Sequence, residues 1–202
     1  MQKSVFVAVA LIGVSYIVGQ NPAGKRDYVG PESLGPYRID HDVPVRNLTQ
    51  ALGQSAKARN QKSCYRSQDG TSFLWFAMTA HSPKMVGQVL LSSFSNCVDG
   101  PVQPTSGLLL SWKTEKGVGL GSTVRQVLAA YGKPLKETKI EGTAYRWVIQ
   151  GDYISEKNRY TNKRRPERGD TVMEYASPDD LRLALFGIRD GRVVWISLSN
   201  SE

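Results

Sequence analysis

A short amphipathic helix is predicted over 124–131, where four apolar side chains recur at helical spacing: Val124, Val127, Leu128 and Tyr131. Thr123 followed by Gln126 matches a capping box at its start. Gly132 stands where a helix commonly ends with positive φ, and Pro134 prevents continuation. The apolar face of this helix is expected to pack on a sheet.

Alternating or continuous apolar runs predict strands in the rest of the chain. Asp190-Gly191 is a strong hairpin signal between runs 181–188 and 192–199. Asp69-Gly70 joins 64–67 to 72–78 in the same way. Further strands are expected at 85–93, 145–150 and 173–176.

The two halves of the chain resemble each other, which favours an internal duplication. Val, Arg, Ala and Gly of 45–53 recur at a constant offset in 124–132. The predicted fold class is therefore α+β, with two tandem repeats, each a short helix followed by a three- to four-stranded antiparallel sheet. The expected order is a signal peptide (1–20), a linker or extended arm (21–37), the first repeat (38–98), a linker (99–107) and the second repeat (108–202), with a basic insertion near 153–170.

The segment around the second predicted helix resembles a known motif. Gly121, Thr123, Val127, Gly132 and Pro134 fit the pattern G-x-T-x-x-x-V-x-x-x-x-G-x-P. This pattern is similar to one in the small outer-membrane assembly lipoproteins of the BamE type and in tandem-repeat β-lactamase inhibitory proteins. The resemblance implies a binding or scaffold protein rather than a catalyst. It carries over no binding residue, and the lipid-bearing cysteine of the lipoproteins has no counterpart.

The first twenty residues have the pattern of a cleavable signal peptide. Lys3 provides a positive start, and 5–18 form an apolar run that is shorter than the roughly 20 residues of a membrane span. Gly19 offers a cleavage point. The mature protein is expected in the periplasm or outside the cell, with no integral membrane span after cleavage. An uncleaved anchor is the alternative.

Only two cysteines are present, Cys64 and Cys97. In an exported protein, two cysteines most simply form one disulfide, and we expect that bridge here. A thiol nucleophile or a metal pair is the alternative, but neither cysteine has a second cysteine or a histidine at ligand spacing.

Charge adds one candidate binding segment. The chain carries a formal net charge of +8, and segment 156–168 contains six basic and two acidic residues. Its cations, with Tyr160 beside them, predict a site for an anionic polymer: Lys157, Arg159, Lys163, Arg164, Arg165 and Arg168. A solvated loop that keeps a sheet edge from pairing is the alternative.

Catalytic and metal-binding motifs are weak in this sequence. The glycine-rich run 117–123 leads into a helix, but it lacks the lysine of a phosphate-binding loop and is better explained as a tight turn. Asp40-His41-Asp42 is interpreted as a turn in which Asp42 caps the first helix, and Asp179-Asp180 as a turn before a strand. We therefore expect no catalytic residue, metal ion or cofactor.

The functional hypothesis from the sequence is an exported, non-catalytic binding or scaffold protein of the bacterial envelope or exterior. Its expected partner is another envelope or extracellular protein. The alternatives are a hydrolase with a dispersed active site, and an anionic-polymer binder that uses the basic segment. The net charge favours acidic partners in each case.

Overall fold

The computed structural model describes residues 28–41, 43–52, 62–79, 82, 84–94, 103–105, 109–139, 171–177 and 181–200. The described part contains mostly strands and two short helices, α1 (Val45–Ala51) and α2 (Val124–Tyr131). The strands in the first half are β1 (Ser33–Leu34), β2 (Tyr37–Arg38), β3 (Val43–Pro44), β4 (Lys62–Arg66), β5 (Phe73–Met78), β6 (Met85–Ser92) and β7 (Gln103–Pro104). A 3₁₀ helix (Leu109–Ser111) precedes α2, and β8 (Lys136–Lys139), β9 (Thr171–Ala176), β10 (Arg182–Arg189) and β11 (Arg192–Asn200) follow it.

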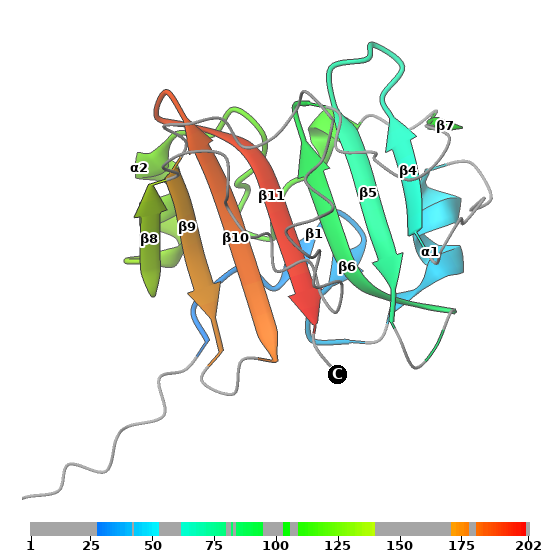
Figure 1. Ribbon diagram of the computed structural model, residues 1–202, viewed down its shortest axis with the longest axis horizontal. Coiled ribbons are helices and arrows are strands. Elements are labelled where there is room, and N and C mark those ends of the chain that lie inside the picture. Colours follow the sequence, from blue (N-terminus) through cyan, green and yellow to red (C-terminus); the bar gives the residue numbers. More distant parts are fainter. Residues whose placement is uncertain are drawn as a thin grey trace, which may run out of the picture.

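One nine-stranded sheet dominates the molecule (Figure 1), in the order β7-β4-β5-β6-β11-β10-β9-β8, with β3 paired to the start of β6. Neighbouring strands are antiparallel except β4 and β7. The last strands of the two expected repeats pair directly, from Ser92 opposite Trp195 to Gln88 opposite Ser199. The predicted fold class of two tandem helix-plus-sheet repeats is therefore wrong, because this is mostly one continuous sheet with two short helices.

The physical reason for this correction lies in strands β6 and β11. Both are buried along most of their length, and both carry apolar side chains on their two faces. If each were the edge of a separate sheet, it would leave a row of unpaired backbone groups beside apolar surface. Pairing β6 with β11 removes both edges. Sequence periodicity reports the faces of a strand but does not identify its lateral partner.

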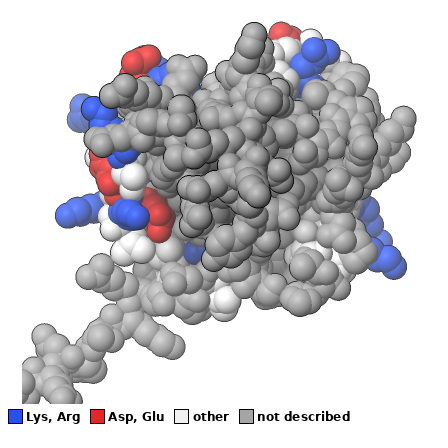
Figure 2. All heavy atoms as spheres, viewed as in Figure 1, with Lys and Arg blue, Asp and Glu red and all other residues white. Residues whose placement is uncertain are grey.

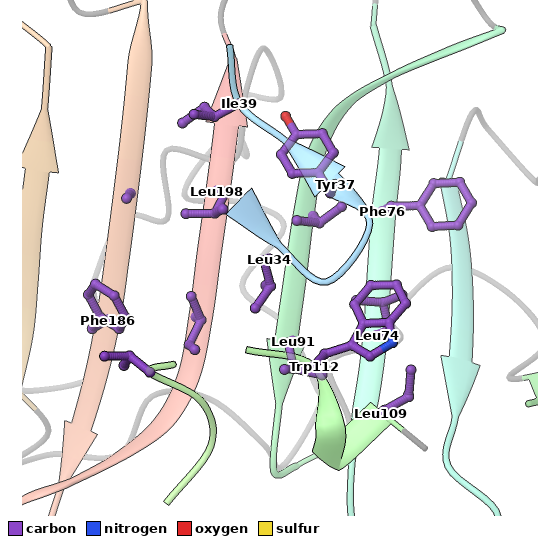
Figure 3. Packing of buried hydrophobic residues seen from close by; sticks show 14 of the residues in the cluster. Leu34, Tyr37, Ile39, Leu74, Phe76, Leu91, Leu109, Trp112, Phe186 and Leu198 are labelled. Carbon is purple, nitrogen blue, oxygen red and sulfur yellow. The ribbon is translucent and has the colours of Figure 1, made fainter. Parts of the chain in front are cut away.

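The two helices and the hairpin β1–β2 pack on one side of the sheet, which we call the first face and define by Leu74, Phe76, Leu91, Phe186 and Leu198. Figure 3 shows Leu34, Tyr37 and Ile39 of the hairpin, with Leu109 and Trp112, lying over these strands. They belong to the same buried cluster as Leu48 of α1 and Val127 of α2. Burial on this scale is the main source of stability for such a fold.

The hairpin of β10 and β11 was predicted correctly. Asp190 and Gly191 have φ of 50° and 71°, as a two-residue turn between twisted strands requires. The hairpin tip also holds the loop before α2, because the amide of Val193 donates to Ser122 O at 2.8 Å and that of Val124 donates to Gly191 O at 3.1 Å. The β10–β11 turn therefore fixes where α2 begins.

The start of α1 differs from expectation. Its N-cap is Pro44, which makes no side-chain capping hydrogen bond, whereas Asp42 was predicted to cap it and lies outside the described residues. The amide of Val45 is satisfied instead by Lys84 O, at 2.8 Å. A tertiary contact thus replaces the local cap. The predicted strand at 145–150 also falls outside the described residues.

Candidate docking surface

Helix α2 has the local structure that its sequence predicts. The hydroxyl of Thr123 accepts from the amide of Gln126 at 3.3 Å, and Oε1 of Gln126 accepts from the amide of Thr123 at 2.8 Å. The predicted capping box is confirmed. Gly132 ends the helix with φ of 69°.

Removing this cap has a measurable expected cost. Thr123→Ala deletes the hydroxyl that satisfies a first-turn amide, so we expect a loss of about 1 kcal/mol in the free energy of unfolding. For a chain of this size the melting temperature should fall by roughly 2–4 °C. Thermal unfolding followed by circular dichroism measures it. Thr71→Ala is the control, because it makes the same substitution on the exposed β4–β5 turn, outside a helix. An equal loss of stability in Thr71→Ala would show that the capping hydrogen bond contributes nothing specific.

The glycine-rich run before α2 has little free hydrogen-bonding capacity. The amide of Gly121 donates to Val193 O at 2.8 Å, and that of Ser122 donates to Gly119 O at 3.1 Å. The amides of Thr123 and Val124 are engaged by Gln126 and Gly191. These groups hold a turn together, which agrees with the tight-turn interpretation of 117–123.

The outward side of α2 differs from the sequence prediction. Val127 and Tyr131 are buried, but Leu128, which was assigned to the same packed face, is 40% exposed. Leu135, after the helix, is 57% exposed. These are two of the four exposed large apolar side chains in the described part of the chain.

Basic residues lie close to the two leucines in the sequence. Arg125, one turn before Leu128, and Lys133, after the helix, are exposed. Residues 116–136 contain four cations and no carboxylate. Helix α2 is only about 12 Å long at 1.5 Å per residue. Lys116 contacts its last turn, where Nζ donates to Ala130 O, and the amide of Leu135 donates to Glu174 O on β9. We call this surface the α2 ridge, made of Lys116, Arg125, Leu128, Lys133 and Leu135.

Lys116 is fixed at the end of this ridge. Its Nζ donates to Ala130 O at 3.0 Å and lies 4.8 Å from the ring centroid of Tyr131. A cation beside the last carbonyls of a helix is favoured by the helix dipole. The Tyr131 hydroxyl donates to Glu115 Oε1 at 3.0 Å and accepts from the Thr114 hydroxyl, whose Oγ1 lies 2.6 Å away. Burial, the largest cause, raises the pKa of Tyr131, so this phenol stays protonated.

The edge strand β8 has a different charge pattern. Lys136 and Lys139 alternate with Glu137, and Glu174 stands opposite Lys136 on β9. Figure 2 shows basic and acidic side chains mixed along this border of the sheet. Mixed charge on a short edge strand is typical of protection against strand pairing. Because its charges are mixed, the β8 edge would attract a charged partner less than the α2 ridge would.

The opposite side of the sheet, the second face, carries a row of side chains across five strands. In register these are Cys64, Trp75, Leu90, Ser197 and Leu185. Nε2 of Gln88 donates to Oγ of Ser197 at 3.1 Å within it. Trp75 and Trp195 are only 7% and 0% exposed. The two tryptophans that the structure describes on the second face are therefore buried.

No metal site was found among the residues that the structure describes. In the Asp40-His41-Asp42 segment, the carboxylate of Asp40 accepts two hydrogen bonds from the Arg38 guanidinium, at 3.0 and 2.9 Å. Hydrogen bonding to Arg38 is the main reason that the pKa of Asp40 is lowered. His41 Nδ1 lies 2.6 Å from its neighbouring backbone oxygen, Asp40 O. A turn held by an ion pair accounts for this segment.

Several predicted site residues lie outside the described ranges. They include Cys97 and all of the basic segment: Lys157, Arg159, Tyr160, Lys163, Arg164, Arg165 and Arg168. The predicted turn at Asp179-Asp180 also lies outside these ranges. Cys64 is buried on β4 opposite Trp75, but its proposed bridge to Cys97 stays a prediction. The signal peptide at 1–20 also falls outside. In the part of the chain that is described, no helix has the length and apolarity of a membrane span.

Comparison with known proteins returned no match to a family model, to a curated protein or to a solved structure. The resemblance to assembly lipoproteins and to β-lactamase inhibitory proteins therefore stays a prediction from the motif around α2.

Proposed function

We propose that this protein is an exported, non-catalytic binding or scaffold protein of the bacterial envelope or exterior, and that the α2 ridge is its docking surface. The observation that carries the proposal is the exposure of Leu128, next to exposed Arg125 on a helix whose other side packs in the core, and of Leu135 shortly after that helix. A surface with an apolar centre and a charged rim has the composition of a protein interface.

The charge of the ridge indicates the partner's chemistry. The three cations of the ridge, Lys116, Arg125 and Lys133, create a positive potential, which attracts an acidic protein surface and speeds its association. Leu128 and Leu135 supply the apolar surface from which water is excluded on binding. The second face is a poorer candidate because its large side chains are already buried.

Site-specific crosslinking tests this proposal. A photoreactive amino acid at Leu128, introduced in the native host, is expected to give one discrete adduct. The same group at Thr71, exposed on the distant β4–β5 turn, should give none. Arg125→Glu with Lys133→Glu should abolish the Leu128 adduct. Arg66→Glu with Lys84→Glu changes the net charge equally, away from the ridge, and should preserve it.

The contrary outcomes are equally specific. Equal adducts at Leu128 and Thr71 would mean non-specific contact. An adduct that survives reversal of Arg125 and Lys133 but is lost on reversal of Arg66 and Lys84 would place docking elsewhere. The absence of any adduct at Leu128, with the variants folded as judged by circular dichroism, would overturn the ridge as a docking surface.

A second candidate function is anionic-polymer binding through segment 156–168, favoured by its six basic residues. Binding to heparin should then weaken with salt, with a log–log slope of magnitude about 0.7–0.9 per phosphate-like contact. Lys163→Ser, Arg164→Ser and Arg165→Ser together should reduce this slope. Their effect on the melting temperature should be small, since solvated charges contribute little to stability. Equal binding by the triple variant, measured by titration at two salt concentrations, would contradict this function.

A further inference from the structure

The hairpin β1–β2 is attached differently from every other strand that the structure describes. It forms a separate two-stranded sheet with only two residue pairs, Ser33 opposite Arg38 and Leu34 opposite Tyr37. It contributes no strand to the ladder of the large sheet. A two-stranded hairpin of this length has little stability of its own, so its order depends on what it contacts.

One carboxylate accepts three hydrogen bonds from the start of the hairpin. Oε2 of Glu115 accepts from the amides of Glu32 and Ser33, at 3.1 and 3.0 Å, and from the Ser33 hydroxyl at 3.3 Å. Oε1 of the same side chain accepts from the Tyr131 hydroxyl at 3.0 Å. Hydrogen bonds to a charged acceptor are stronger than neutral ones. Glu115 thus ties the hairpin to the last turn of α2.

The seat of the hairpin is otherwise apolar. Leu34, Tyr37 and Ile39 are fully buried on the first face, and Gly35 lies against Trp112 so closely that a Cβ would come within 2.6 Å of its ring. Figure 3 shows the hairpin between Leu198 and Phe76, across the middle of the sheet. Further hydrogen bonds reach it from outside: Gly35 N donates to Lys113 O at 3.0 Å, and Tyr37 OH donates to Gly87 O at 3.1 Å. The Tyr37 hydroxyl is also hydrogen-bonded to the backbone of Asn200 on β11.

From this arrangement we infer that residues 28–39 form a strap that opens as a unit while the large sheet stays folded, with Glu115 as its latch. Elements that lack ladder hydrogen bonds to the rest of a fold open at lower free energy than the core strands do. Opening removes Leu34, Tyr37 and Ile39 from the first face and uncovers apolar surface around Leu198 of β11. This opening does not depend on what the α2 ridge binds.

Native-state hydrogen exchange of the full mature chain tests the strap. Its probes are the amides of Ser33, Gly35 and Ile39, which are hydrogen-bonded to Glu115, Lys113 and Glu32. The comparison amides are those of β10 and β11. We expect the strap amides to exchange at least tenfold faster than the sheet amides. Their urea dependence should be measurable but smaller than that of the sheet amides, because opening the strap exposes Leu34, Tyr37 and Ile39 but not the rest of the core.

Variants identify the latch. Glu115→Ala should speed exchange of the strap amides by a further tenfold or more and leave β10 and β11 within twofold of wild type. Glu32→Gln is the matched control, because its side chain is a half-exposed carboxylate of the strap itself, 3.9 Å from Arg38, and lies outside the latch. In Glu32→Gln, the strap amides should exchange at the wild-type rate.

Two results would overturn the inference. If strap and sheet amides of wild type exchange at the same rate with the same urea dependence, the hairpin is an integral part of the core. If Glu115→Ala speeds both sets together, the carboxylate supports the whole fold and is not a latch. The wild-type measurement decides the first point even where Glu115→Ala fails to fold.

Discussion

Gly187→Val is expected to destabilise the protein by about 3 kcal/mol. Gly187 on β10 stands directly opposite Trp195 on β11, and a Cβ at this position would lie 1.7 Å from Nε1 of that indole. Trp195 is fully buried, so its ring has no free direction in which to yield. Overpacking alone costs about 1–3 kcal/mol, and displacing a buried tryptophan adds to it.

A double-mutant cycle separates this steric effect from a general intolerance of the strand. In a Trp195→Ala background the indole is gone, so adding Gly187→Val should cost less than about 1 kcal/mol. Leu183→Ile, on the same strand and face, conserves volume and should cost less than about 1.5 kcal/mol. Urea unfolding gives all four values. Additive effects of the Gly187 and Trp195 substitutions would show that the indole does not lie over Gly187.

The features that the sequence predicted correctly depend on residues close to one another in the chain. The Thr123–Gln126 box, the end of α2 at Gly132 and the Asp190-Gly191 turn all depend on contacts between near neighbours, and the structure confirms each. Such signals depend on local backbone geometry, so they can be identified before the fold is known.

The order of the strands across the sheet could not be predicted from such local signals. The pairing of Gln88 with Ser199 joins residues that are far apart along the chain, and alternation of apolar residues is the same whichever strand lies beside them. The halves of the chain therefore looked like separate repeats. The fold class was wrong for this reason, although the helices and most strands of the described part were placed correctly.

The proline- and glycine-rich segment 21–37 gave a similar difficulty. Its composition predicted an arm or linker, and nothing in its pattern indicated the hairpin at Ser33–Arg38. The hairpin is held by Glu115 and Trp112, which come much later in the sequence. Buried Leu34 and Tyr37 acquire their role only through those distant contacts.

The α2 ridge was missed because one leucine was assigned to the wrong side of the helix. Leu128 follows the apolar spacing of Val124, Val127 and Tyr131, yet an eight-residue helix on a flat sheet buries a narrower stripe. The lack of any carboxylate between Lys116 and Lys136 was a usable signal. The charge of segment 156–168 is the stronger signal, with six basic residues in thirteen.

Phe186→Ala is expected to have the largest effect on the first face, a loss of about 3–5 kcal/mol. Phe186 is fully buried on β10, and its ring centroid lies 5.8 Å from that of Tyr131 and 5.9 Å from that of Tyr175. These three rings come from α2, β9 and β10, so the phenylalanine joins the helix to the sheet. Its removal leaves a cavity that neighbouring aromatic rings fill poorly.

Thermal unfolding with near-ultraviolet circular dichroism measures this effect and the order of the aromatic rings together. Phe186→Leu keeps most of the volume and should lose clearly less stability than the alanine variant. Leu128→Ala, on the exposed side of α2, should change the free energy of unfolding by less than about 0.5 kcal/mol. Because typical domains have only about 5–15 kcal/mol of stability, Phe186→Ala should also loosen α2 and weaken any docking on the ridge. If the free energy of unfolding of Phe186→Ala lies within about 1 kcal/mol of wild type, less than cavity formation costs, the three rings do not hold α2 to the sheet.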